Sequence, residues 1–285
     1  MQIQSQPFLK VKDYSVSQES FDLILDEKYD MLITHPKPQD SDLGKYYNSE
    51  DYISHTDSKR SFFEKVYHQV RVYTIAQKER LLFKEVKRAG KVLDIGCGTG
   101  DFLAYCKVKK WDTFGIEPSE KAKAIAQKKG VAFFNSLDEI PDNTFDAITL
   151  WHVLEHVPDL DFYINQISRI AKPGATIIVA VPNFKSYDAN FYKQYWAAYD
   201  VPRHLWHFSK TSIKNLFEDK NFSLVKTLPM YFDSFYVSML SEKYKNGKMN
   251  FLKSFFVGFR SNMHGMIKNE YSSHIYVLLN TKKSF

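Results

Sequence analysis

The chain has 285 residues, of which 44% are hydrophobic and 25% charged, so it can hold one large domain with additions or two small ones. Its net charge of +6 comes from scattered lysines, which suits an acidic substrate or a membrane surface but predicts no nucleic-acid binding. The presence of only two cysteines argues against a disulfide framework. The sequence shows no apolar run typical of a signal peptide and no stretch of 18 apolar residues, so we expect a cytoplasmic protein.

Residues 1–57 are polar and aromatic without a clear period, and we interpret them as an N-terminal cap. Apolar runs within the cap predict two short strands, at 21–25 and 31–33. The segment 46–55 is an expected loop, dense in aromatic and hydrogen-bonding side chains. Between 58 and 88 apolar residues recur at helical spacing, which predicts one or two helices ahead of the core.

The central part of the chain alternates strands and helices. Ser119 and Asp159 are placed to cap two of these helices. Continuous apolar strands separated by helices are typical of a parallel sheet covered on both faces. The expected strands of this part are 91–95, 113–116, 131–134, 145–150 and 175–181.

The pattern loosens after the fifth core strand. We expect an aromatic, histidine-rich loop at 183–209, which would lie near the acceptor of a reaction at the sheet edge. A helix at 210–220 and a strand at 222–228 follow. A helical, basic and aromatic insertion at 230–270 then precedes the last strand, expected at 273–280. The chain therefore predicts an α/β fold of the Rossmann-like, doubly wound type, with residues 58–285 in one domain.

A glycine-rich turn ends the first core strand in the pattern D-x-G-x-G-x-G, from Asp94 to Gly100. Glycines there let a ligand approach the backbone, and the helix that follows points free N–H groups at it. The third glycine comes one residue earlier than in the dinucleotide pattern G-x-G-x-x-G. Glu117, at the end of the second core strand, is placed to accept hydrogen bonds from ribose hydroxyls; the structural alternative is an acid at a helix start.

Residues 91–181 together resemble the class I S-adenosylmethionine-dependent methyltransferases. The glycine turn corresponds to their motif I, and Glu117 corresponds to the acid of their second strand. Two further strings carry the likeness, P-x-x-x-F-D-A-I at 141–148 and K-P-G-A at 172–175.

The string H-V-L-E-H-V-P-D at 152–159 narrows this resemblance to the ubiquinone/menaquinone-biosynthesis type. The segment D-V-P-R-H-L-W-H-F-S at 200–209 is similar to one shared by the methyltransferase-domain-23 subgroup. The likeness covers about residues 45–229. It implies a seven-stranded sheet, S-adenosyl-L-methionine as the cofactor and S-adenosyl-L-homocysteine as the product.

The resemblance also implies where the cofactor would be held. The glycine turn would line the methionine part of the cofactor, and Glu117 would hold its ribose. Two residues after the third strand would flank its adenine. Two residues after the fourth strand would lie beside the sulfonium, and Arg71 is a candidate partner for the carboxylate, with a surface salt bridge as the alternative. The cofactor residues predicted in this way are Arg71, Asp94, Gly96, Cys97, Gly98, Gly100, Glu117, Pro118, Ser136, Leu137, Trp151 and His152.

The sequence argues against two kinds of metal site. Relatives begin with a small zinc ribbon, but cysteine is absent from residues 1–96, so no thiolate zinc site can form there and the region must depend on packing. The string His152-x-x-Glu155-His156 matches an inverted zinc-peptidase motif, yet Pro158 follows too soon for a metal-binding helix. We therefore expect no metal.

Methyl transfer mainly requires alignment of the acceptor with the methyl group and exclusion of water. We expect a small-molecule acceptor, methylated at oxygen: a quinone-like phenol, or a hydroxyl of a glycan or lipid precursor. The base would be a histidine, with His204 favoured over His156 and His152; a hydrogen-bonded structural role is the alternative for each. The rival functions are an NAD(P)-dependent oxidoreductase and a non-catalytic S-adenosylmethionine-binding module.

The insertion at 230–270 carries apolar residues flanked by lysines. It could cover the acceptor site, meet a second subunit or lie on a membrane surface, and packing against the core is the simplest reading. The chain would accordingly be a monomer or a homodimer, with peripheral membrane contact as an option.

Overall fold

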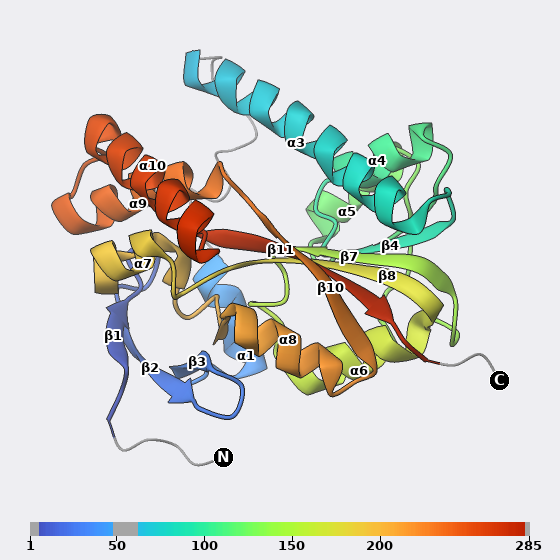
Figure 1. The fold of residues 1–285 in the computed structure, drawn as a ribbon, viewed down its shortest axis with the longest axis horizontal. Helices are drawn as coiled ribbons and strands as arrows, with labels where there is room; N and C mark the ends of the chain where they lie inside the picture. The colour runs from blue at the N-terminus through green and yellow to red at the C-terminus, as the bar shows by residue number, and fades with distance from the viewer. Residues whose placement is uncertain (1–5, 48–61, 283–285) are drawn as a thin grey trace.

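The computed structural model describes residues 6–47 and 62–282, and its centre is a seven-stranded sheet (Figure 1). The strand order is β10-β11-β8-β7-β4-β5-β6, and β11 is antiparallel to both of its neighbours whereas the other pairs are parallel. The predicted mostly parallel, doubly wound sheet is therefore confirmed. The strands are β4 (Lys91–Ile95), β5 (Asp112–Ile116), β6 (Ala132–Phe133), β7 (Phe145–Trp151), β8 (Ala171–Pro182), β10 (Phe222–Pro229) and β11 (Ser273–Asn280).

Helices cover both faces of this sheet (Figure 1). Val92 and Leu93 are neighbours on β4 but belong to different apolar clusters, because successive side chains of a strand point to opposite faces. One face is covered by α3 (Phe62–Val86), α4 (Asp101–Val108) and α5 (Glu120–Lys128), and the other by α6 (Leu160–Ile170) and α8 (Lys210–Glu218).

Two helix starts form as the sequence predicts. The side chain of Ser119 accepts a hydrogen bond from the N–H of Ala122 in α5, and Asp159 accepts one from the N–H of Phe162 in α6. Each cap satisfies a backbone donor that the first turn of a helix leaves free. These two caps therefore fix the residues at which α5 and α6 begin.

A second, four-stranded sheet forms from the N-terminal cap, in the order β1-β2-β3-β9. The two predicted cap strands appear as β2 (Ser20–Asp26) and β3 (Met31–His35). The other two were not predicted: β1 (Leu9–Lys12) is short, and β9 (Trp206–His207) comes from the loop at 183–209. The cap and this loop therefore share one sheet; α1 (Asp40–Leu43) and a 3-10 turn (Gly44–Tyr47) follow β3.

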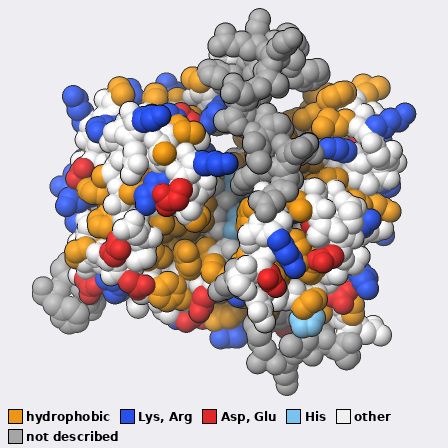
Figure 2. Space-filling view, turned by 180° about the vertical axis from the view of Figure 1, so that it is seen from behind, with side chains coloured by type: hydrophobic (Ala, Val, Ile, Leu, Met, Phe, Trp, Pro, Cys, Tyr) orange, Lys and Arg blue, Asp and Glu red, His pale blue; other side chains and the backbone are white. Residues whose placement is uncertain are grey.

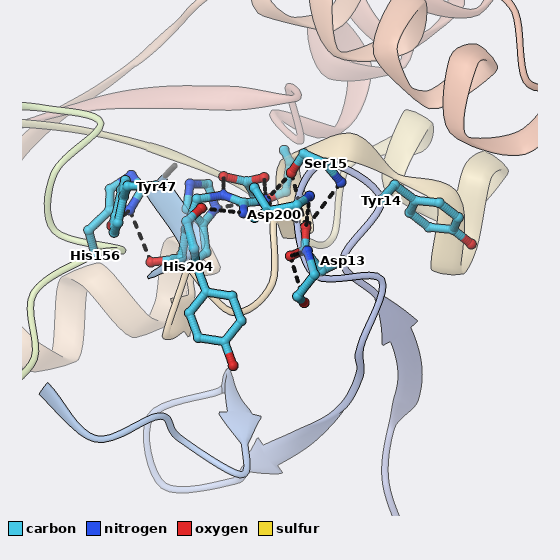
Figure 3. A network of polar contacts seen from close by, with 12 residues as sticks. Asp13, Tyr14, Ser15, Tyr47, His156, Asp200 and His204 are labelled. Carbon is cyan, nitrogen blue, oxygen red and sulfur yellow. Dashed lines mark hydrogen bonds and ion pairs between the residues drawn. The ribbon is translucent and has the colours of Figure 1, made fainter. Parts of the chain in front are cut away.

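A buried arginine, Arg203, also joins the cap to this loop, and its partners Asp13, Ser15 and Asp200 are labelled in Figure 3. The guanidinium of Arg203 donates to carboxylate oxygens of Asp13, at 3.1 Å, and of Asp200, at 2.6 Å. It also donates to the hydroxyl of Ser15 and, at 2.9 Å, to the carbonyl oxygen of Tyr46. The cap is thus held by this ion-pair network as well as by apolar packing.

The insertion forms two helices, α9 (Asp233–Asn246) and α10 (Phe251–Lys268), which lie beside α7 (Tyr187–Tyr192) (Figure 1). A Cβ atom at Gly258 would come within 2.8 Å of the Phe235 ring, so the two helices approach closely there. Packing explains one face of α10, which buries small residues and Val257. The opposite face is apolar and exposed, so packing against the core does not account for the whole insertion. The exposed apolar residues of this face are Phe251, Leu252, Phe255, Phe256, Phe259, Met266 and Ile267.

Candidate functional site

The glycine turn lies where the order of the central sheet reverses. From β4 the chain continues to β5 and β6 on one side, whereas β7 and β8 lie on the other. In open α/β sheets, ligands bind outside the carboxyl ends of the strands at such a point. The candidate site is therefore at the ends of β4, β5 and β7.

All three glycines of the turn have positive φ angles, +69° at Gly96, +55° at Gly98 and +73° at Gly100. A Cβ atom at Gly96 would lie 2.5 Å from Val153, and one at Gly100 would lie 2.6 Å from Ala126. At Gly98 it would meet nothing within 4 Å. The outer glycines are thus required by packing, whereas the central one leaves open space into which a ligand can fit.

Glu117 holds the turn from the end of β5. One carboxylate oxygen accepts from the N–H of Gly98 at 2.8 Å, and the other accepts from the N–H of Ser119 at 2.9 Å. The side chain is half-buried, and Pro118 beside it is exposed. An anionic acceptor group is therefore fixed next to the open space at Gly98.

Asp94 lies under the turn and is buried. Its carboxylate accepts a hydrogen bond from the Thr149 hydroxyl at 2.6 Å. Burial raises the pKa of Asp94 to about 7, Glu117 adds to this rise, and the Thr149 hydrogen bond and the Lys78 charge oppose it. The group therefore titrates near neutral pH.

The side chain of Cys97 faces the protein rather than the site. It belongs to the apolar cluster under α4, and a Cβ atom at Gly115 would lie 2.7 Å from its sulfur. Burial raises the pKa of this thiol well above its usual range. Cys97 can therefore contribute only its backbone to a ligand.

Trp151 ends β7 next to the turn and carries an indole N–H that has no hydrogen-bond partner among the described residues. The ammonium of Lys78, on α3, lies 4.2 Å from the centre of its ring. Burial lowers the pKa of Lys78, and the charges of Asp94 and Asp233 oppose that shift. The sequence pattern did not single out Lys78, because it is one of many lysines on a long helix.

Arg71 reaches the glycine turn from α3, where it makes the surface salt bridge that the sequence left open as the alternative to a cofactor contact. Its guanidinium is paired there with Asp101, and it also donates to the Thr99 hydroxyl at 3.3 Å. Lys129 donates to the same carboxylate at 2.7 Å. Burial would raise the pKa of Asp101, but these partners together hold it below its usual range.

The two residues predicted beside the adenine follow β6. Ser136 is half-buried, whereas Leu137 is buried in the core cluster under α6. The carbonyl oxygen of Leu137 accepts a hydrogen bond from Arg169 at 2.9 Å. Of these two side chains, only that of Ser136 is available to a ligand.

His152 follows β7 with a φ angle of +57°. Its Nε2 lies 3.2 Å from a carboxylate oxygen of Asp233, and its Nδ1 lies 3.4 Å from one of Glu155, a contact too long for a good hydrogen bond. Burial alone lowers the pKa of His152, but these two carboxylates raise it to about 10. The two carboxylates therefore favour the protonated imidazole, which counts against His152 as the base.

Glu155, His156 and His204 come together beside this histidine, and one potential metal-ligand atom of each lies within 4.8 Å of the others. Nδ1 of His156 donates to the Arg203 carbonyl oxygen at 3.0 Å and lies 3.2 Å from the Tyr47 hydroxyl (Figure 3). Burial lowers the pKa of His156 to about 4, and the charge of His204 adds to this effect. His156 is therefore a neutral imidazole.

The loop at 183–209 places its two histidines differently. Nδ1 of His204 donates to the Ala198 carbonyl oxygen at 2.9 Å, which leaves its Nε2 lone pair free. His207 instead lies with its Nε2 3.0 Å from the Thr34 hydroxyl, and burial holds its pKa well below the usual value. Figure 2 shows a histidine side chain at the base of a hollow in this face of the molecule.

Residues 48–61 lie outside the described residues, so the predicted closing of the aromatic segment 46–55 over the cofactor stays a prediction. None of the described helices is long and apolar enough to span a membrane.

The family model of a methyltransferase domain matches residues 66–227. Over 115 residues the chain is 31% identical to the demethylmenaquinone methyltransferases of Bacillus mycoides and Bacillus cereus, a match that covers 36% of this chain and 48% of those enzymes. The chain thus spans about half the length of the curated relatives it matches.

Solved structures share the fold at low sequence identity. The 1,6-didemethyltoxoflavin-N1-methyltransferase of Burkholderia thailandensis is 16% identical, with a TM-score of 0.53 over 95% of this chain and 100% of that one. A SAM-dependent methyltransferase from Archaeoglobus fulgidus is 18% identical, with a TM-score of 0.52 over 77% of this chain and 100% of that one.

Proposed function

Because this chain belongs to the class I S-adenosylmethionine-dependent methyltransferases, we propose that it transfers a methyl group to a hydroxyl of a small-molecule acceptor. The observation that carries this proposal is the open space at Gly98, at the reversal of the sheet, with the Glu117 carboxylate fixed beside it. When bound, S-adenosyl-L-methionine supplies a methyl group on a positively charged sulfur. The protein has to hold this cofactor, orient the acceptor and exclude water.

The residues present fit this cofactor. Asp94 offers a carboxylate to its ammonium group, and Glu117 offers one to the ribose hydroxyls. The unpartnered indole N–H of Trp151 and the ammonium of Lys78 are donors for its carboxylate, a role that Arg71 fills less readily because it is paired with Asp101. The ring of Trp151 already attracts one cation, which supports the prediction that it lies beside the sulfonium.

For the acceptor, we propose proton removal by His204. Its Nδ1–H is fixed on a carbonyl oxygen, so Nε2 is free to take a proton, and the nearby carboxylate of Glu155 would stabilise the imidazolium that forms. His156 is the alternative base, although its lowered pKa makes it the weaker one. The curated relatives are named for a quinone precursor, which supports a quinone-like acceptor over a glycan or lipid precursor.

We further propose that residues 1–57 form a cap and residues 183–209 an acceptor loop on the methyltransferase domain. The pairing of β9 with β3 supports this division, and so does the Arg203 network, because both join the loop to the cap. Whether the chain acts as a monomer or a homodimer stays a prediction.

The test of cofactor binding is calorimetric titration with S-adenosyl-L-homocysteine. We expect micromolar binding, about −8 kcal/mol, and at least about a tenfold weakening in Glu117→Gln. The matched control is Glu120→Gln, which removes an exposed acid three residues later and should bind as the wild type does.

Two results would contradict the proposal. Binding of NADH, seen as a change in nicotinamide fluorescence, without binding of S-adenosyl-L-homocysteine would establish the oxidoreductase alternative. Cofactor binding without methylation of any phenol, glycan or lipid-precursor hydroxyl would favour the non-catalytic module.

A further inference from the structure

Glu155, His156 and His204 form a group of side chains whose types and positions match a metal site. Glu155 and His156 lie in the turn after β7, and His204 lies in the acceptor loop. The N–H of Leu205 donates to the Glu155 carbonyl oxygen at 2.8 Å, which ties the two segments together. The Thr34 hydroxyl donates to the His204 carbonyl oxygen at 2.7 Å, so the loop is also anchored to the cap.

Each histidine of the group is oriented as metal ligands usually are. Nδ1 of His156 donates to the Arg203 carbonyl oxygen, and Nδ1 of His204 donates to the Ala198 carbonyl oxygen. A histidine that binds a metal ion usually donates its other ring N–H to such an oxygen, which fixes the ring and the tautomer. This tautomer places the lone pair of each ring on Nε2, where it is available to an ion.

The carboxylate of Glu155 provides an independent observation. The side chain is 1% exposed, and neither of its oxygens has a hydrogen-bond partner in the described part of the chain. Its ion pair with His152 is 3.4 Å long, and His152 also pairs with Asp233. A buried carboxylate without hydrogen bonds is costly, so a further cation beside it would be stabilising.

A second neighbouring cation, Arg203, cannot fill this role. The guanidinium of Arg203 is already occupied by Asp13, Asp200 and backbone and hydroxyl oxygens. The group therefore offers two imidazole nitrogens and one carboxylate whose ion pair with His152 is long, at 3.4 Å.

We propose that Glu155, His156 and His204 bind a divalent transition-metal ion of the zinc, cobalt or iron(II) type. Two imidazole nitrogens and a carboxylate oxygen suit these ions, and three protein ligands leave a position for a hydroxyl or water. Ligand atoms around such an ion are about 3.4 Å apart, so the side chains must close in from their present separation of up to 4.8 Å.

The sequence led us to expect no metal because Pro158 follows the His152-x-x-Glu155-His156 string too soon for a metal-binding helix. His152 instead pairs with Asp233 through its Nε2. The fold replaces it with His204, which is distant in the sequence.

Metal binding itself does not depend on methyl transfer, but its consequence for the reaction rests on the proposed function. The Nε2 atom of His204 either binds the ion or accepts a proton. With an ion bound, His204 would be a ligand and not the base; the ion would lower the pKa of the acceptor hydroxyl, whose proton would pass to water.

The test is a titration of the chelator-treated full chain with Co²⁺, followed by visible absorption, and with Zn²⁺, followed by calorimetry. We expect one ion per chain and a visible cobalt spectrum of low coordination number. Glu155→Gln and His156→Gln should each weaken binding at least about tenfold. His207→Gln, a buried histidine of the same loop that is not a ligand, is the matched control and should bind as the wild type does.

Circular dichroism and thermal unfolding of each variant without metal separate a lost ligand from a lost fold. Bound metal should raise the melting temperature of the wild type and of the His207→Gln control, but not of the two ligand variants. The proposal is overturned if the wild type binds no ion, or if both variants fold and bind as tightly as the His207→Gln control. Calorimetry with S-adenosyl-L-homocysteine on the same samples reports on the proposed function separately.

Discussion

Asp94 shows how one buried residue can couple cofactor binding to pH. With its pKa raised to about 7, the folded protein holds this proton more tightly than the unfolded chain does. Between about pH 4 and 7 the stability contributed by Asp94 therefore falls as the pH rises. The ammonium group of the cofactor would favour the ionised form, so binding below pH 7 should release a proton.

We accordingly predict that the affinity for S-adenosyl-L-homocysteine rises by about tenfold between pH 6 and 8. Asp94→Asn should bind weakly at both values, with no such rise. The measurement is calorimetry in buffers of different ionisation enthalpy, which also counts the released protons. An affinity of the wild type that is independent of pH would disprove the coupling.

The glycine turn gives a second prediction at the level of single residues. Gly100→Ala combines a positive φ with a Cβ atom 2.6 Å from Ala126, and we expect a loss of about 2 kcal/mol or more in the free energy of unfolding. Gly98→Ala adds its Cβ atom to open space, so it should cost only about 1 kcal/mol but weaken cofactor binding. Urea unfolding and calorimetry measure the two effects, and equal losses of stability would contradict this reading of the turn.

At the level of elements, the outer face of α10 is the feature that packing leaves unexplained. Leu252 is 70% exposed and Phe256 60%, and lysines at 248 and 268 border the helix. An apolar face edged by positive charge is typical of a helix that lies on an anionic membrane.

We predict that the chain co-sediments with vesicles containing anionic lipid, less so at high salt. The double variant Leu252→Ser, Phe256→Ser should lose most of this binding without losing stability, since both side chains are exposed. Val108→Ser, which removes an equally exposed apolar residue from α4, serves as the control. If the double variant sediments as the wild type does, α10 is not the contact.

At the level of the whole molecule, Arg203 connects the cap, the acceptor loop and the region of the site. Arg203→Met would leave Asp13 buried without its charged partner, and we expect a loss of about 3–5 kcal/mol in the free energy of unfolding. Lys185→Met removes the exposed ion pair with Asp30, which joins the same loop to the cap, and should cost less than about 1 kcal/mol. Urea unfolding compares the two, and similar losses would refute the special role of Arg203.

The same network predicts how the cap responds to acid. Burial would raise the pKa of Asp13, but hydrogen bonds from the Ser17 backbone and the charge of Arg203 hold it below its usual value. Its contribution is therefore complete above about pH 4 and is lost as the pH falls further. Proteolysis of the cap should accelerate in that range before the central sheet unfolds.

The sequence by itself determined the order of the central strands and helices, the glycine turn and the caps at Ser119 and Asp159. These features depend on local patterns: apolar runs, positive φ angles that favour glycine, and side chains that bond within a single helical turn. For the same reason the family could be inferred from motifs that each lie within about ten residues.

The tertiary structure alone decided which distant residues meet. It paired β9 with the cap, set Lys78 over Trp151, placed His152 beside Asp233 and brought His204 to Glu155. No local pattern encodes these contacts, because each joins segments that only the packed fold brings together. The charge and the proton affinity of the histidines followed from those contacts and from burial, and so could not be read from the sequence.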